Sequence, residues 1–373
     1  MERLHVMARP DKAEKLESIG LSFHGWDDYW NEDVCYRFTA KQVDELEEAT
    51  NELHSMCLRA VKHVIDTRRF AELGIPEAYW DAIAKSFEQS DFTLYGRFDF
   101  AYDGVNPPKM LEYNADTPTS LLESAVAQWY WMEDKFPDAD QFNSLHDKLV
   151  ARWKALDPKY HTIHFASISE NEEDWVCVHY LMETAIQAGR IARHIYVEDI
   201  GYNEKSETFV DVNGDEILAL FKLYPWEWLM VEEFGQHVAK SKTLFIEPMW
   251  KSVLSNKGIL AILWELFPDH PNLLPAYLEP NKLSSYAKKP FFSREGANVE
   301  LIQDGKQVAA DEGPYGAEGH VYQQLTELPV FEGCYPVVGS WVVGDESAGI
   351  CIREDVLKIT TNMSNFIPHY FTE

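Results

Sequence analysis

The sequence predicts an α+β protein that contains one embedded β-α-β unit. Three observations support this fold class: a long amphipathic helix before a candidate hairpin, a strand–helix–strand pattern near the middle of the chain, and short strands that predominate after residue 243. The 373 residues are 46% hydrophobic and 13% aromatic, so the chain has enough apolar material for a sizeable core. This length suits two or three lobes.

The first element is a helix over residues 41–65. Six apolar residues recur there at helical spacing with a polar face between them, and they are Val43, Leu46, Leu53, Cys57, Val61 and Ile65. A coiled coil needs apolar heptads over a longer stretch, so we expect this helix to pack on the core of its own domain.

The second element is a hairpin over about residues 94–116. Side chains alternate between the two faces of a strand, so Arg97 and Asp99 share one face, and Glu112 and Asn114 share one face of the return strand. A turn centred on the loop between the strands sets Asp99 opposite Glu112, and Arg97 opposite Asn114. Directly opposite residues lie about 5 Å apart, so four polar groups would converge on one patch.

Spacing alone leaves two interpretations of this patch open. Two carboxylates and a carboxamide are hard oxygen donors, the ligands that Mg²⁺ takes when phosphates and waters complete its octahedron. A neighbouring arginine adds a guanidinium group whose N–H donors can bind phosphate oxygens. The alternative is a solvent-exposed sheet face with an Arg–Asp cross-strand pair, which stabilises the fold only slightly.

The third element is a β-α-β unit. The pattern predicts a strand at residues 161–168, a helix at 172–188 that ends at Gly189, and a second strand at 190–197. Because a helix connects the two strands, we expect them to be parallel. An α/β substrate subdomain is predicted over about residues 160–240.

Short strands make up the rest of the prediction. They cover residues 243–247, 285–290, 297–301 and 322–325, followed by a hairpin of strands 336–343 and 349–353 around a turn at 344–349.

Basic residues among these strands are candidates for phosphate binding. Ser255 is a plausible N-cap that places Lys257 in the first turn of a helix, where backbone N–H groups favour an anion. Lys289 precedes a loop between two strands, and Arg294 lies within it, so that loop could close over phosphates. Arg353 lies at the end of a later strand. Each position by itself also fits an ordinary solvated surface charge.

Composition and missing motifs argue against several classes of protein. The net charge of −29 disfavours nucleic-acid binding and polybasic docking on membranes and would attract a cation, although an acidic surface that only aids solubility fits it too. The five cysteines lack C-x-x-C spacing, which argues against a zinc site or a disulfide framework. P-loop, dinucleotide, serine hydrolase and zincin signatures are absent. Without a signal-peptide pattern or an apolar stretch near ~20 residues, we expect a cytoplasmic protein with no membrane partner.

The order of the motifs is similar to that of a known family. The motifs are R-x-D at 97–99, E-Y-N-A-D-T-P from 112, S-N-K-G-I-L from 255, Y-A-K-K-P from 286 with R-E-G at 294–296, V-Y-Q-Q-L from 321 and C-I-R-E-D from 351. Together they resemble the ATP-grasp synthetase domain of the glutathionylspermidine synthase family over nearly the whole chain. The stand-alone bacterial members assigned as acid–amine ligases are the most similar.

This resemblance implies an ATP-grasp-type fold, like that of glutathionylspermidine and glutathione synthetases. It implies a single synthetase unit over residues 1–373, in which about residues 243–330 form a nucleotide-binding lobe with a phosphate-covering loop. The family couples a carboxylate to an amine at the expense of ATP through an acyl phosphate, which implies ATP and Mg²⁺ as cofactors.

The resemblance also implies roles for the matching residues. The residues that match the Mg²⁺ ligands are Asp99, Glu112 and Asn114. The arginines that match those at the reacting centre are Arg97 and Arg294. The residues that match nucleotide-binding positions are Lys257, Lys289, Gln324, Leu325 and Arg353. The hydroxyl positions near the acid substrate are matched by Thr117 and Thr119.

The two substrates are less well defined. An amine is cationic at neutral pH and needs carboxylates to bind it. The candidate carboxylates are Glu172, Glu173, Asp174 and Glu227. A solvated acidic surface explains these residues equally well. Two segments depart from the family pattern: the glycine-poor loop at 291–293, and residues 222–228 near the position of a glutathione-binding threonine.

We therefore expect an ATP- and Mg²⁺-dependent ligase for a small carboxylate, including peptide-like acids, and an amine, including polyamines. The alternatives are genuine glutathionylspermidine synthesis and a nucleotide-binding regulatory protein without turnover.

Overall fold

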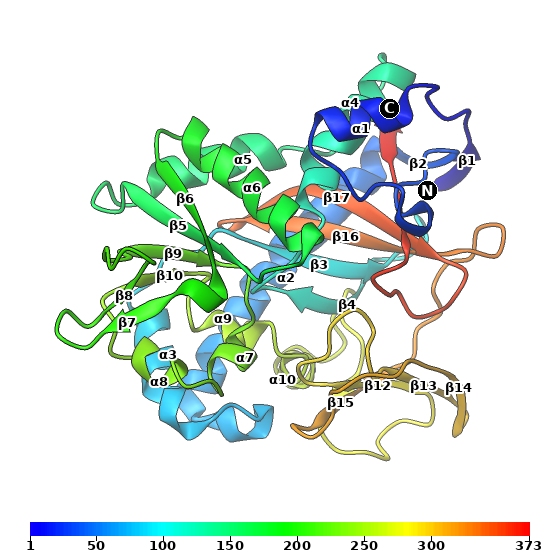
Figure 1. Ribbon diagram of the computed structural model, residues 1–373. Coiled ribbons are helices and arrows are strands. Elements are labelled where there is room, and N and C mark those ends of the chain that lie inside the picture. Colours follow the sequence, from blue (N-terminus) through cyan, green and yellow to red (C-terminus); the bar gives the residue numbers. More distant parts are fainter.

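The chain folds into mixed α and β structure built on five sheets, as Figure 1 shows. This computed structural model describes residues 1–373, except for the side chain of Asp27. The predicted α+β class is confirmed, and three of the sheets surround the predicted site.

The first of these is an antiparallel sheet in the order β18-β17-β16-β3-β4, and it contains the predicted hairpin. Its strands are β3 (Tyr95–Ala101), β4 (Lys109–Asn114), β16 (Tyr335–Val343), β17 (Glu346–Asp355) and β18 (Asn365–Ile367). Arg97 pairs with Asn114 and Asp99 with Glu112, so the predicted register is confirmed. A bulge follows Asp99, and the register therefore shifts only beyond these pairs.

The turn between β16 and β17 is tighter than predicted. The strands extend to Val343 and from Glu346, so only two residues connect them instead of the predicted span 344–349. Gly344 adopts a left-handed φ of 62°, which permits so short a connection.

Helix α2 (Ala40–Thr67) covers one face of this sheet and confirms the helix predicted over 41–65. It begins with a capping box, in which the Thr39 hydroxyl accepts from the Gln42 N–H and the Gln42 side chain accepts from the Thr39 N–H. The box fixes the start of the helix at Ala40, one residue before the predicted start.

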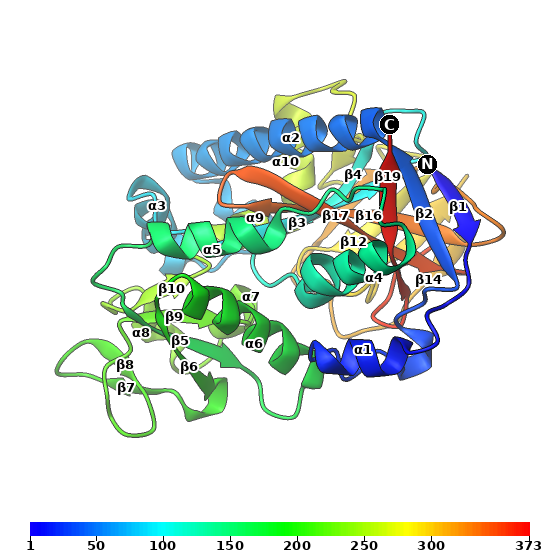
Figure 2. The same ribbon diagram turned by 90° about the horizontal axis from the view of Figure 1, so that it is seen from above.

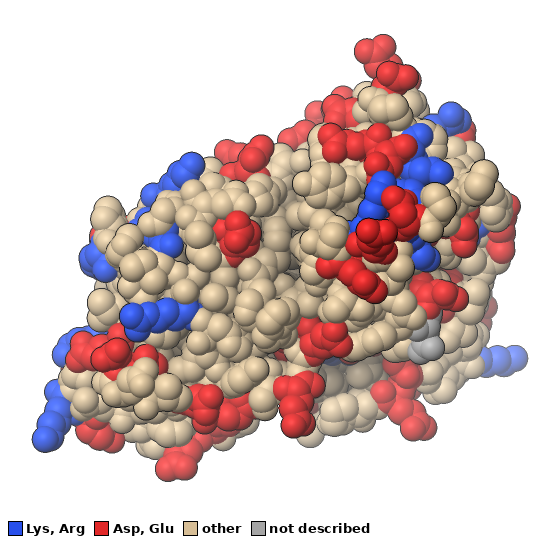
Figure 3. Space-filling view, turned by 45° about the horizontal axis from the view of Figure 1, so that its top comes forward, with Lys and Arg blue, Asp and Glu red and all other residues tan. Residues whose placement is uncertain are grey.

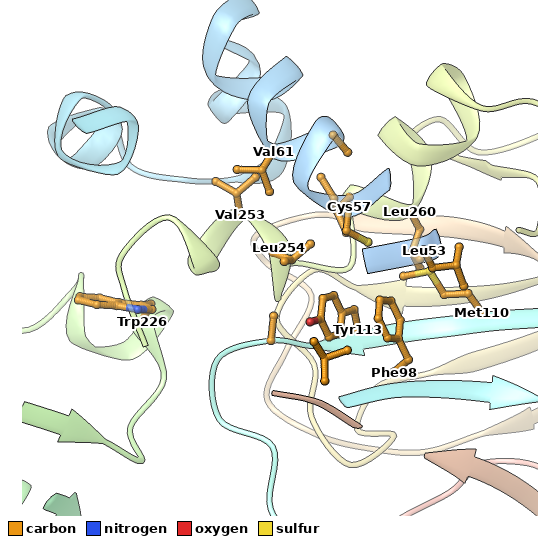
Figure 4. Close-up of a cluster of buried hydrophobic side chains, with 14 of the residues drawn as sticks. Leu53, Cys57, Val61, Phe98, Met110, Tyr113, Trp226, Val253, Leu254 and Leu260 are labelled. Carbon is orange, nitrogen blue, oxygen red and sulfur yellow. The ribbon is translucent and has the colours of Figure 1, made fainter. Parts of the chain in front are cut away.

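The hairpin turns its apolar face toward α2, as Figure 4 shows. Phe98 stacks on Tyr113 with ring centroids 3.8 Å apart. Gly96 permits this packing, because a Cβ there would lie 2.9 Å from the Tyr113 ring. Because side chains alternate along each strand, burial of Phe98 and Tyr113 places the neighbouring polar residues on the opposite face of the hairpin.

The second sheet is parallel, in the order β10-β9-β5-β6. Its strands are β5 (Thr162–Ser167), β6 (Ile191–Tyr196), β9 (Ala219–Lys222) and β10 (Leu244–Ile246). Helix α6 (Glu172–Gln187) connects β5 to β6, so the predicted β-α-β unit is confirmed. A small hairpin follows it, formed by β7 (Gly201–Asn203) and β8 (Thr208–Val210).

The third sheet has the order β11-β15-β12-β13-β14 and lies below β4 in the view of Figure 1. Its strands are β11 (Ala276–Tyr277), β12 (Tyr286–Pro290), β13 (Glu300–Gln303), β14 (Lys306–Ala310) and β15 (His320–Gln324). The strand predicted from residue 297 begins only at Glu300. The N–H groups of Ala297 and Val299 instead close turns onto Arg294 and Gly296.

The remaining elements enclose these sheets. The two ends of the chain meet in a sheet of order β1-β2-β19 and lie side by side in Figures 1 and 2. Its strands are β1 (Glu2–His5), β2 (Val34–Thr39) and β19 (His369–Thr372). The other α-helices are α1 (Lys12–Ser18), α3 (Trp80–Glu88), α4 (Gln128–Lys135), α5 (Leu145–Ala155), α7 (Trp226–Leu229), α8 (Gly235–Val238), α9 (Lys251–Leu254) and α10 (Ile259–Leu266).

The helix start predicted at Ser255 is wrong. Ser255 follows the last residue of α9, and Lys257 lies in the turn between α9 and α10 instead of in the first turn of a helix. The buried Asn256 holds this turn, because its side-chain oxygen accepts from the Gly258 N–H. The side-chain hydrogen bond in this turn therefore comes from Asn256 and not from Ser255.

The surface reflects the charge of the sequence. Figure 3 shows acidic side chains spread over one face, with basic side chains in smaller groups. Within the described part of the chain, no helix combines the length and apolar character needed to cross a membrane.

Candidate active site

The β3–β4 hairpin presents four polar side chains to a cavity of about 230 Å³. Arg97 and Asp99 come from β3, and Glu112 and Asn114 come from β4. Period-two alternation places all four on the face opposite the apolar core. The structure therefore brings together the four residues that the sequence singled out first.

Arg97 and Asp99 form a two-pronged ion pair. Arg97 Nε lies 2.7 Å from Asp99 Oδ1, and Nη2 lies 3.1 Å from Oδ2. The third nitrogen donates to the Thr119 carbonyl at 3.1 Å, and the guanidinium lies over the Trp341 ring at 5.5 Å. Burial alone would lower the pKa of Arg97, but Asp99 outweighs it and raises this pKa. The cavity therefore holds a fixed cation.

Asn114 connects the two carboxylates. Its Nδ2 donates to Asp99 Oδ2 and to Glu112 Oε1, each at 3.1 Å. The side-chain oxygens of Asp99, Glu112 and Asn114 are suitable ligands for Mg²⁺, because this ion takes hard oxygen ligands and usually completes its shell with phosphate and water. The described side chains form no group of three or more His, Cys, Asp or Glu that could hold a metal unaided.

Two lysines approach Glu112 from other elements. Lys257 Nζ lies 3.0 Å from Glu112 Oε2 and donates to the Ser293 carbonyl at 2.6 Å. Lys289 Nζ donates to Gln323 Oε1 at 2.7 Å. The center is therefore a cluster of alternating charges supplied by the first and third sheets and by the turn before α10.

The charges within this cluster shift one another's pKa. Burial opposes ionisation of Glu112, but Lys257 and Lys289 outweigh it and lower the pKa of Glu112 to about 2. Burial, reinforced by Lys257, lowers the pKa of Lys289 to about 8 although Glu112 opposes this. Glu112 is therefore fully ionised at neutral pH, and Lys289 is mostly protonated there but loses its proton near pH 8.

A second cavity of about 400 Å³ meets the first at Asp99 and Glu112, which line both. Lys289, Gln324 and Leu325 also line it. The apolar side chains in its lining include Ala287, Val299, Leu301, Val308 and Val330. An apolar slot that ends at a lysine and two carboxylates suits a flat molecule with an anionic tail.

The loop between β12 and β13 reaches across to the first cavity through Arg294. Its Nη1 donates to the Thr117 hydroxyl at 2.6 Å, and its Nη2 donates to Glu227 at 3.0 Å. Burial opposes the charge of Arg294, but Glu227 outweighs it and raises the arginine pKa. The loop is thereby fastened to the segment that follows β4.

Acidic side chains also lie at the first cavity. Thr119 donates its hydroxyl to Glu173 at 3.0 Å, and Asp174 and Glu295 line the cavity. Burial, together with Glu173, raises the pKa of Asp174 to about 7 and also raises that of Glu295. The lining of the first cavity thus combines arginines with carboxyl groups whose pKa is raised.

Three of the predicted site residues are already bonded to other groups of the protein. Glu172 is exposed and accepts a hydrogen bond from the Ser22 hydroxyl. Glu227 is paired with Arg294. Arg353 lines the first cavity, but it donates to backbone carbonyls of residues 361–364 at 2.8–3.1 Å.

Sequence reasoning missed two residues of the site. Gln323 is buried and contacts Lys289, whereas the motif match named the neighbouring Gln324. Strand alternation could have found it, because Gln323 shares a face of β15 with the buried Val321. Glu295 lies next to Arg294 in sequence, but no local signal indicates that its side chain reaches the cavity.

Comparisons with known proteins agree with the motif order. A model of the family described as "Glutathionylspermidine synthase preATP-grasp" matches residues 3–372. A Haemophilus influenzae protein named "Putative acid--amine ligase" is 45% identical over 97% of each chain. The "Trypanothione synthetase" of Crithidia fasciculata is 29% identical, covering 83% of this chain and 52% of its own. The "Bifunctional glutathionylspermidine synthetase/amidase" of Escherichia coli is 28% identical, covering 89% of this chain and 58% of its own.

The relatives are all named as ligases or synthetases, and this chain is an enzyme of the ATP-dependent carbon–nitrogen ligase class. It belongs to the glutathionylspermidine synthase family, as the match over nearly its whole length shows.

Proposed function

We propose that this enzyme joins a carboxylate to an amine through an acyl phosphate, with ATP and Mg²⁺. One observation carries the proposal: Asp99 and Glu112 line both cavities. A metal held between two cavities can bind phosphate oxygens that enter from one and face an acid that enters from the other.

The second cavity is the proposed nucleotide site. The adenine would lie against the apolar side chains near Gln324 and Leu325, and the phosphates would extend toward Lys289 and Lys257. In this proposal about residues 243–330 form the nucleotide lobe and about residues 160–240 the substrate subdomain of one ATP-grasp-type unit. The loop that carries Arg294 would cover the phosphates.

The residues of the hairpin would hold and balance charge. Asp99, Glu112 and Asn114 would hold Mg²⁺, once the Asn114 carboxamide turns its oxygen inward in place of Nδ2. The ion would supply neutralisation of the phosphate charge. Arg97 and Arg294 would face the transferred phosphoryl group, since phosphoryl transfer depends mainly on positioning and charge stabilisation.

The reaction we propose has two steps. A carboxylate oxygen bonds to the γ-phosphorus of ATP, and the bond to the bridging oxygen breaks so that ADP leaves. The nitrogen of the amine then attacks the acyl carbon, and the bond from that carbon to the bridging oxygen breaks. Phosphate leaves with this oxygen, and the nitrogen loses a proton. Thr117 and Thr119 would contact the acid, and the carboxylates of Glu173 and Asp174 would attract the cationic amine. Arg353 would act beyond these contacts by holding the 361–364 segment at the cavity.

A screen of carboxylate and amine pairs tests this function. Phosphate release with ATP and Mg²⁺ would be measured for each pair, and the condensed product would be detected by mass. Glutathione with spermidine belongs in the screen because relatives are named for glutathionylspermidine synthesis. A pair that releases phosphate and forms an amide supports the proposal. Nucleotide binding without product from any pair would favour a regulatory protein.

A further inference from the structure

The loop between β12 and β13 carries a buried hydroxyl that the proposed mechanism does not use. Ser293 is 3% exposed, and its Oγ makes no hydrogen bond to any group that the structure describes. An unpaired buried hydroxyl destabilises the protein, because its lost hydration is not replaced by a hydrogen bond. A bound group that accepts a hydrogen bond from Ser293 would recover this free energy.

Ser293 lines a small polar cavity beside the charged cluster. The cavity has a volume of about 20 Å³, which suits one oxygen atom. Two cations border it, Lys257 and Arg294, together with the hydroxyl-bearing Thr117. The cavity therefore brings one unpaired hydroxyl together with two cationic side chains.

The carboxylates that border the same cavity are already neutralised. Asp116 Oδ1 lies 2.7 Å from Lys222 Nζ, and Glu227 lies 3.0 Å from Arg294 Nη2. Because each carboxylate is paired with a cation, neither repels an anion as strongly as an unpaired carboxylate would. The donor groups and the size of the cavity fit one oxygen of a phosphate or a carboxylate.

The cavity shares Asn114, Thr117 and Arg294 with the first cavity, so it lies where the transferred phosphoryl group would meet the acid. It borders Asn114, a proposed metal ligand, and Lys257, which contacts Glu112. Ser293 and Lys257 are also joined directly, because Lys257 donates to the Ser293 carbonyl. An oxygen at this point would lie next to the metal and the lysine, where the transferred group of the nucleotide is expected.

We propose that the Ser293 hydroxyl donates a hydrogen bond to an oxygen of the terminal phosphoryl group of ATP. This inference rests on the proposed function and adds a specificity-determining contact to it. The contact exists only with a triphosphate, so Ser293 helps the enzyme to distinguish ATP from ADP. The glycine-poor loop then supplies a side-chain donor close to the phosphates.

Nucleotide binding measured by calorimetry tests the contact without a known acid or amine. Wild type and Ser293→Ala would be titrated with a non-hydrolysable ATP analogue and with ADP, each with Mg²⁺. A hydrogen bond to a charged oxygen predicts at least tenfold weaker binding of the triphosphate in Ser293→Ala. Binding of ADP should stay within about twofold. The matched control is Ser255→Ala, which removes a second serine hydroxyl from the same cavity.

Each outcome decides the matter. Equal weakening of both nucleotides, unchanged binding of both, or the same selective loss in Ser255→Ala would overturn the contact. A higher KM for the acid with unchanged nucleotide affinities would also overturn it and assign the cavity to the carboxylate. Wild-type protein that binds neither nucleotide would refute the proposed function itself. Thermal unfolding of each variant checks that the fold is retained.

Discussion

Replacing Glu112 with Gln removes one charge from the buried cluster and keeps the shape of the side chain. Glu112 Oε2 lies 3.0 Å from Lys257 Nζ, and its other oxygen accepts from Asn114 at 3.1 Å. The carboxylate also opposes the lowering of the Lys289 pKa. The substitution therefore leaves two buried ammonium groups with less counter-charge.

The geometry sets the expected size of the effect on stability. Unit charges 3.0 Å apart attract by about 5 kcal/mol at an effective dielectric constant of about 20, and desolvation offsets part of this. Breaking a fully buried ion pair costs about 3–5 kcal/mol. The Glu112 side chain is 23% exposed at the cavity, and Gln keeps one oxygen that can accept from Lys257, so we expect the free energy of unfolding to fall by about 2 kcal/mol.

The effect on turnover has a separate cause. A metal ion supplies several kcal/mol of charge stabilisation in the transition state, and about 1.4 kcal/mol corresponds to tenfold in rate. Loss of one of the proposed metal ligands should lower Mg²⁺-dependent phosphate release at least a hundredfold. The substitution should also lower the pKa of Lys289 below about 8, because the wild-type Glu112 carboxylate opposes the effect of burial and the variant lacks that charge.

Urea unfolding and phosphate release measure the two effects. Glu300→Gln is a matched control, because Glu300 pairs with Lys288 at 2.7 Å but both side chains are partly exposed. That pair should contribute less than about 1 kcal/mol, and its loss should leave turnover unchanged. Wild-type turnover in Glu112→Gln would refute the metal assignment. A stability loss no larger than that of Glu300→Gln would refute the electrostatic argument.

Three further substitutions test two residues of the site and the buried carboxyl group of Glu123, which accepts a hydrogen bond from Tyr29. Arg97→Ala should lower kcat more than nucleotide affinity, because its contact belongs to developing charge; kinetics with equal losses would contradict this. Burial and Glu173 raise the pKa of Asp174 to about 7, so kcat/KM for the amine should rise between about pH 6 and about pH 8. In Asp174→Asn the profile should be flat, and the same slope in both proteins would contradict this role. Burial raises the pKa of Glu123 from 4.5 to about 7, so the folded state binds this proton more tightly than the unfolded chain and stability falls as pH rises through this range. Urea unfolding at about pH 5 and pH 8 should show about 3 kcal/mol less pH-dependent loss in Glu123→Gln, and equal losses would rule out this titration.

Local periodicity accounts for the successful structural predictions. The pairing of Asp99 with Glu112 follows from alternation and turn position alone. The β-α-β unit likewise follows from apolar spacing and the glycine that ends its helix. The error at Ser255 has the opposite origin, because a contact distant in sequence decided it: the buried Asn256 also donates to the Leu73 carbonyl.

Charge pairing shows a similar limit. Glu227 and Arg294 are far apart in sequence, yet they form an ion pair at 3.0 Å. Glu172 and Glu173 are neighbours, yet the first contacts Ser22 and the second contacts Thr119 at the cavity. No local pattern states which acid faces solvent and which faces a ligand, because that depends on which elements pack beside the helix.

The sequence by itself determined the α+β class, the face of the hairpin that bears the polar groups, and the family to which the motifs belong. Backbone geometry repeats every two or a few residues, so these properties are written in short stretches of chain. Tertiary structure alone decided that two cavities meet at Asp99 and Glu112 and that two lysines lower the pKa of Glu112. Electrostatic and packing forces act through space, and only the folded chain sets the distances on which they depend.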